Sequence, residues 1–76
     1  MKVLVIDGQG GGLGKALIAT FAKAFPTVPL IALGTNSLAT SAMLRAGAAA
    51  GATGEHAIAW QARDADLILG AAGILI

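Results

Sequence analysis

The N-terminal stretch KVLVIDGQGGGLGKA, residues 2–16, decides the fold class of this chain. Its first six residues form an almost uninterrupted apolar run, and five glycines follow within seven positions. An apolar run of this kind is typical of a parallel strand that is covered on both faces. A strand that leads through a glycine-rich turn into a helix is the usual start of a parallel α/β unit.

The remainder of the chain alternates helical and extended patterns. Leu13, Leu17, Phe21 and Ala24 recur at helical spacing and predict one apolar stripe, and Pro26 ends that helix. The expected elements are strand 2–7, helix 13–25, strand 30–33, helix 38–46 with Ser37 as its N-cap, helix 54–62 and strand 67–70. A strand at 58–60 competes with the third helix, and the small-residue segment 46–54 receives no assignment.

This order predicts an α/β fold: a Rossmann-like βαβαβ half-unit of three layers with a three-stranded parallel sheet. The 76 residues suffice for a single domain, residues 1–76. In a Rossmann-type sheet the first strand is central, with a second half of the fold beyond it. Because that half is missing here, strand 2–7 is expected to present a bare apolar edge. A homodimer through that edge, a partner subunit, or a fragment of a longer domain are the alternatives.

The composition excludes several classes of function. Five Lys/Arg against four Asp/Glu give a net charge of +1, too low for a nonspecific nucleic-acid binder. Without cysteine, and with one histidine, the chain has no disulfide framework and no Cys-based zinc site. The N-terminal apolar run is too short for a signal peptide, and the uncharged stretch 24–44 contains prolines and polar residues. A cytoplasmic protein with no nucleic-acid or membrane partner is therefore expected.

The glycines after strand 2–7 predict a phosphate-binding loop, because glycine lets main-chain N–H groups approach a ligand at a helix N-terminus. They fit the spacings GxxGxxG and GxxxGxG, whereas the strict dinucleotide pattern GxGxxG fails at Leu13. The expected contact residues are Gly8, Gly10, Gly11, Gly12, Leu13, Gly14 and Lys15.

Two charged residues border this loop. The segment that contains Lys15 resembles a P-loop but has Gln9 and Ala16 where that motif needs glycine and a hydroxyl, which disfavours an ATPase. Lys15 either contacts a phosphate or is a solvated residue of the first helical turn. Asp7 would repel a phosphate unless a metal or loop amides neutralise it. A role for Asp7 in capping the glycine amides is favoured over a catalytic or metal role, and no metal site is predicted.

The ends of the two later strands complete the predicted site. Thr35, Asn36 and Ser37 follow strand 30–33, where NAD-binding proteins usually place an acid on the ribose. These residues either contact a ribose or its 2′-phosphate, or shape the turn and cap the helix, which is the favoured interpretation. The small residues Gly70, Ala71 and Gly73 would border a base. The expected cofactor is NAD or NADP, with a mononucleotide as the alternative.

No catalytic group can be assigned, so enzymatic activity stays uncertain. Glu55 and His56 form an acid–base pair in sequence, but no nucleophile can be placed beside them. A surface position for His56 is favoured. Trp60 is expected in the core or at an interface.

Three segments resemble signature blocks of an uncharacterised family of small bacterial Rossmann-like proteins, a domain of unknown function. They are VIDGQGGGLGK, GTNSLATSAMLRAGA and GATGEHAI. The resemblance runs from Val5 to about Gly73 and implies a Rossmann-like fold in a fragment or shortened relative. The chain departs from the family in stopping early, at His56 and at the GAAG turn. The resemblance transfers no activity and no catalytic residue.

A weaker resemblance, through the Gly8–Gly14 loop, is to dinucleotide-binding oxidoreductases. The first hypothesis is thus nucleotide or dinucleotide phosphate binding. The second is an accessory or interaction subunit that pairs through its strand edge and has a non-functional glycine loop. The third, an NADP-dependent reductase, has the least support.

Overall fold

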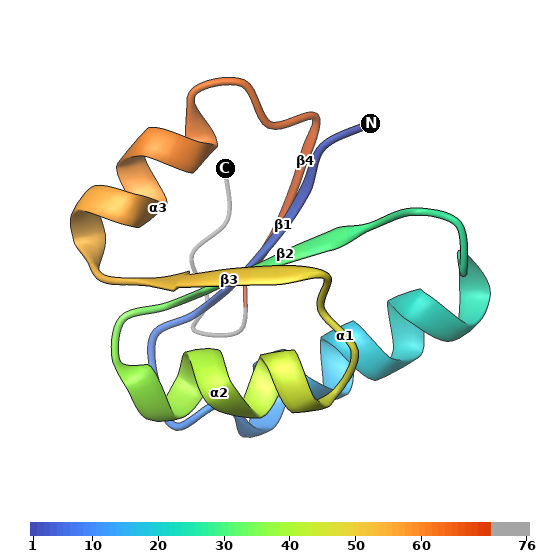
Figure 1. Cartoon of the computed structure of the whole chain (residues 1–76), viewed down its shortest axis with the longest axis horizontal. Helices are drawn as coiled ribbons and strands as arrows, with labels where there is room; N and C mark the ends of the chain where they lie inside the picture. Colours follow the sequence, from blue (N-terminus) through green and yellow to red (C-terminus); the bar gives the residue numbers. More distant parts are fainter. Residues whose placement is uncertain (71–76) are drawn as a thin grey trace.

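The structure, a computed structural model, describes residues 1–70, which form four parallel strands and three helices (Figure 1). The elements are β1 (Val3–Asp7), α1 (Gly12–Ala24), β2 (Leu30–Gly34), α2 (Ser37–Arg45), β3 (Ala50–Thr53), α3 (Glu55–Ala62) and β4 (Leu67–Gly70). The strand order is β3-β2-β1-β4. In the inner strand β1, Val5 lies opposite Ala32 of β2 on one side and Leu69 of β4 on the other.

The sheet is covered on both faces, which gives the three layers expected from the sequence. Helices α1 and α2 lie on one face and α3 on the other (Figure 1). Side chains of β1 alternate between two buried clusters: Val5 packs with Ile18 of α1 and Met43 of α2, whereas Leu4 packs on the face of α3. Burial on both faces explains why β1 is an apolar run without polar alternation.

The predicted three-stranded sheet is wrong, because segment 50–53 forms a fourth strand, β3. Its sequence, AGAT, contains none of the large β-branched or aromatic residues that indicate a strand. The strand packs closely against α2, and a Cβ atom on Gly51 would lie 3.0 Å from Cγ2 of Thr40 and 3.1 Å from Cγ of Leu44. The predicted third helix is confirmed, at Glu55–Ala62, and the competing strand at 58–60 is wrong.

The expected bare edge of the first strand is also wrong. Strand β4 pairs with β1 from Val3–Leu67 to Ile6–Gly70, so a dimer or partner subunit cannot add to the sheet through β1. The physical reason is the route of the chain: α3 packs on the far face against β3, β2 and β1, and carries the chain across them to the other side of β1. Within residues 1–70, the edge strands are β3 and β4.

The structure changes the predicted N-cap of α2 and the expected position of Trp60. The N-cap of α2 is Asn36 rather than Ser37, because its Oδ1 accepts a hydrogen bond from the N–H of Ala39 at 2.9 Å. Trp60 is not in the core: it is 62% exposed on α3, with the guanidinium of Arg63 3.7 Å from its ring centre.

None of the three helices in the described part of the chain is long and apolar enough to cross a membrane.

Candidate functional site

The candidate site lies where the parallel strands end. Because β1, β2, β3 and β4 run in the same direction, their C-terminal residues Asp7, Gly34, Thr53 and Gly70 lie at one edge of the sheet. The chain leaves β1 through α1 on one face and reaches β4 through α3 on the other. The loop 8–11 follows β1 at this edge and lies against the start of α2, where Asn36 donates to the main-chain carbonyl of Gln9.

The buried side chain of Asp7 binds main-chain N–H groups in the loop and in the first turn of α1. This side chain is 1% exposed. Its Oδ1 accepts a hydrogen bond from the N–H of Gln9 at 2.7 Å, and its Oδ2 accepts one from the N–H of Gly14 at 2.9 Å. These contacts confirm the favoured interpretation, in which the carboxylate caps amides of the loop and of the first turn of α1. Both carboxylate oxygens are therefore occupied by the chain itself.

The loop glycines divide into two kinds. Gly11 and Gly14 are needed for packing: Gly11 has a φ of +94°, and a Cβ atom there would lie 2.8 Å from Cβ of Ala42. A Cβ atom on Gly14 would lie 2.6 Å from Sδ of Met43. By contrast, a Cβ atom on Gly10 or Gly12 would meet no atom within 4 Å. Gly10 and Gly12 therefore border open space, where a ligand has room.

Four consecutive main-chain N–H groups at the start of α1 have no acceptor among residues 1–70. The N–H groups of Gly10, Gly11, Gly12 and Leu13 donate to no described residue. The first α-helical hydrogen bond of α1 runs from the N–H of Lys15 to the carbonyl of Gly11, at 2.8 Å. Unpaired donors at a helix N-terminus are the groups that bind anions in proteins.

Asn36 connects the ends of β1 and β2. Its Nδ2 donates to the main-chain carbonyl of Gln9 at 2.7 Å, while its Oδ1 caps α2. The N–H of Thr35 donates to the main-chain carbonyl of Asp7 at 3.1 Å. Asn36 thus has the structural role favoured from the sequence, and the exposed side chains of Thr35 and Ser37 remain for a ligand.

Thr40 joins the ends of β2 and β3. Its Oγ1 accepts a hydrogen bond from the N–H of Gly34 at 3.1 Å and lies 2.9 Å from Oγ1 of Thr53. It also lies 3.3 Å from the carbonyl of Asn36, the back-bonding contact expected for a helical threonine. The network fixes this edge of the sheet, and a Cβ atom on Gly34 would lie 2.5 Å from the hydroxyl of Thr40.

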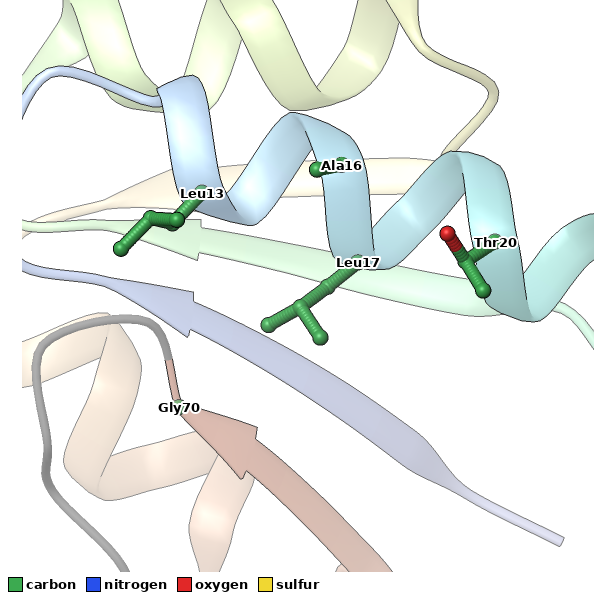
Figure 2. Close-up of a pocket in the computed structure, with 5 residues that line it drawn as sticks. All are labelled: Leu13, Ala16, Leu17, Thr20 and Gly70. Carbon is green, nitrogen blue, oxygen red and sulfur yellow. The ribbon is translucent and has the colours of Figure 1, made fainter.

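An apolar groove lies along α1. It has a volume of about 320 Å³ and lies between α1 and the end of β4 (Figure 2). Its lining residues are Leu13, Ala16, Leu17, Thr20 and Gly70. The sequence predicted Leu13 and Gly70 as ligand contacts, placed Leu17 only in the apolar stripe of the helix, and assigned no role to Thr20. The periodic apolar stripe of α1 has no feature that separates a groove wall from a core contact.

Other predicted residues lie apart from this arrangement or outside the described part. Lys15 is exposed in the first turn of α1. His56 is exposed at the start of α3, which is the position favoured from the sequence. Ala71 and Gly73 lie outside residues 1–70. Within those residues, no three His, Cys, Asp or Glu side chains come together in a way that could hold a metal ion.

A family model described as "Domain of unknown function (DUF3842)" matches residues 2–76. The chain belongs to the DUF3842 family. This membership confirms the resemblance to an uncharacterised domain family, and the DUF3842 description names no ligand or reaction. No curated protein and no solved structure shows significant similarity to the chain. Evidence for the function of this DUF3842 member therefore comes from the geometry of its site.

Proposed function

We propose that this chain binds a nucleotide through a phosphate group that lies against the loop between Gly8 and Leu13. The observation that carries the proposal is the row of four N–H groups, Gly10 to Leu13, with no acceptor among residues 1–70. The positive end of the α1 dipole points in the same direction and favours an anion there. Lys15, exposed one turn into the helix, adds positive charge near the loop.

The strand order supports a Rossmann-like arrangement of this site. The order β3-β2-β1-β4 matches the first four strands of the dinucleotide-binding order 3-2-1-4-5-6. In such sheets the ligand lies outside the carboxyl ends of the strands, where neighbouring connections leave toward opposite faces. By analogy with that strand order, the ligand would lie between the ends of β1 and β4, which are Asp7 and Gly70.

The surrounding residues suggest how the rest of a nucleotide would bind. The hydroxyls of Thr35 and Ser37 are exposed after β2 and would contact the ribose or its phosphate, whereas both polar atoms of Asn36 are used by the protein. The base of the nucleotide would lie beside Gly70 at the end of β4, as expected from the sequence. NAD, NADP and a mononucleotide all satisfy the phosphate contacts, and no residue is assigned to catalysis.

The experiment is a calorimetric titration of the protein with NAD, NADP, ADP and AMP. The Gly12→Val variant places a β-branched side chain in the open space beside the free amides and is expected to weaken binding at least about tenfold, a cost of about 1.4 kcal/mol. Ala19→Val is the matched control, because Ala19 is exposed on the same helix and does not border the loop. Absence of binding by the unaltered, folded protein overturns the proposal, and so does equal binding by both variants.

A further inference from the structure

The edge strand β3 has unpaired main-chain groups on its outer side. Strand β2 lies along one side of β3, and no strand of residues 1–70 lies along the other (Figure 1). The N–H of Gly54, directly after β3, donates to the carbonyl of Gly34 in β2 at 2.9 Å. Main-chain groups alternate between the two sides of a strand, so Ala52 also faces β2. Gly51 and Thr53 therefore present their N–H and carbonyl groups to the open side.

Strand β3 lacks the features that keep an edge strand from pairing. Such strands usually carry lysine, proline or a bulge, or are covered by another element. The segment 46–54 contains no charged residue and no proline. Gly51 and Thr53 are exposed. The other edge strand within residues 1–70, β4, directly follows Asp64 and Asp66. Of these two edges, β3 is therefore the one that is open to a further strand.

Three exposed side chains lie around the edge formed by β3. Leu44 of α2 is 41% exposed and covers the strand, since its Cγ lies 3.1 Å from where a Cβ atom on Gly51 would be. Arg45, in the last turn of α2, comes shortly before the start of β3. Glu55, the first residue of α3, comes shortly after the end of β3. Neither Arg45 nor Glu55 forms an ion pair within residues 1–70.

We infer that β3 is a homodimer interface, at which a second copy of the chain adds its own β3 antiparallel about a two-fold axis. Gly51 of each copy would exchange both of its main-chain hydrogen bonds with Thr53 of the other. In this arrangement the start of one strand lies beside the end of the other. Each Arg45 then lies at the same end as Glu55 of the other copy, and symmetry provides this pair twice.

The charges identify the occupant as a second copy. An incoming antiparallel strand meets Arg45 at one end of β3 and Glu55 at the other, so it must carry an acid and a base in the opposite order. The chain itself satisfies this condition. Strand β3 has only four residues, so its main-chain hydrogen bonds are few and the contacts beside the strand contribute to affinity. The inference does not depend on the proposed nucleotide site.

The test measures the oligomeric state of the whole chain by sedimentation from micromolar to millimolar concentration. A monomer–dimer equilibrium is expected, with a dissociation constant that rises with salt. Arg45→Glu replaces both attractive pairs by repulsion and is expected to raise that constant at least about tenfold. Lys23→Glu is the matched control, because Lys23 is also an exposed base in the last turn of its helix, α1. Its effect is expected to be less than about twofold.

A charge reversal completes the test. Combining Arg45→Glu with Glu55→Arg restores the attraction and is expected to return the dissociation constant to within about threefold of that of the unaltered chain. Both positions are exposed, so the variants are expected to keep the fold, which circular dichroism checks. In the unaltered chain, hydrogen exchange at the N–H groups of Gly51 and Thr53 is expected to slow as the protein concentration rises.

Three results would overturn the inference. A folded chain that stays monomeric up to millimolar concentration leaves the edge of β3 to a different partner chain. A dimer that Arg45→Glu and Lys23→Glu weaken equally is one in which the copies meet at another surface. The same holds for a dimer in which hydrogen exchange at Gly51 and Thr53 does not change with concentration.

Discussion

The side-chain amide of Asn36 donates a 2.7 Å hydrogen bond to the main-chain carbonyl of Gln9 and joins two loops that are far apart in the sequence. Its other polar atom, Oδ1, accepts from the N–H of Ala39 and caps α2. One side chain thus begins a helix and holds the glycine loop beside it. The shape of the candidate site therefore depends on a residue that donates to the protein rather than to a ligand.

Replacing Asn36 separates these two roles. Asn36→Ala removes both hydrogen bonds and is expected to lower the free energy of unfolding by about 1–2 kcal/mol, mostly through the lost cap. Asn36→Ser keeps an N-cap acceptor but cannot reach Gln9, so it should cost distinctly less. Urea unfolding of the two variants measures the difference. Equal losses of stability would show that the cap contributes little.

The glycine loop predicts opposite outcomes for neighbouring substitutions. Gly11→Ala and Gly14→Ala are expected to cost about 2 kcal/mol or more, because the new methyl group overlaps Ala42 in one case and Met43 in the other. Gly12→Ala fills open space at the first residue of α1 and should be neutral or stabilise the fold by up to about 1 kcal/mol. Chemical denaturation of the three variants tests this order. A large loss for Gly12→Ala would contradict it.

The threonine network gives a third prediction. Thr40 is 6% exposed, and Thr40→Val would leave the N–H of Gly34 without its partner at nearly the same side-chain volume. An unsatisfied buried donor costs about 1–3 kcal/mol. Thr53→Val, at an exposed position, removes one contact of the same network and should cost less than about 1 kcal/mol. Thermal unfolding of both variants provides the comparison, and a smaller effect at Thr40 would refute this account.

The sequence correctly predicted the elements in which large apolar side chains are buried. Strands β1, β2 and β4 are apolar runs because both of their faces are covered, and α1 ends one residue before Phe25, close to the predicted stop. Strand β3 was missed because it consists of small residues, which suit its close packing against α2, where a Cβ atom on Gly51 would lie 3.0 Å from Cγ2 of Thr40. Small residues that permit close packing look like a loop in a single sequence.

The pairing of β1 with β4 was not predictable for a different reason. Strand order depends on which face the α3 connection crosses and how far it carries the chain, and no short motif records that distance. Within the site, Asp7 was predicted correctly because a carboxylate directly before a run of glycines has nearby amides to cap. The choice between Asn36 and Ser37 failed because both are good N-cap residues and differ by one position.

The ion pair between Lys2 and Asp64 predicts how a surface contact responds to pH. The hydrogen bond from Lys2 lowers the pKa of Asp64 below its ordinary value of 3.8. A carboxyl group with a lower pKa in the folded state stabilises the fold above its unfolded pKa, and this contribution is lost as the pH falls through the folded value. The side chain of Asp64 is 73% exposed, so water and salt weaken the contribution. We therefore expect Asp64→Asn to lower the melting temperature slightly at neutral pH, and the difference from the unaltered chain to shrink on acidification well below 3.8 or in concentrated salt. Melting curves over this range decide the point, and a difference that grows toward acid pH would mean that Asp64 acts through another contact.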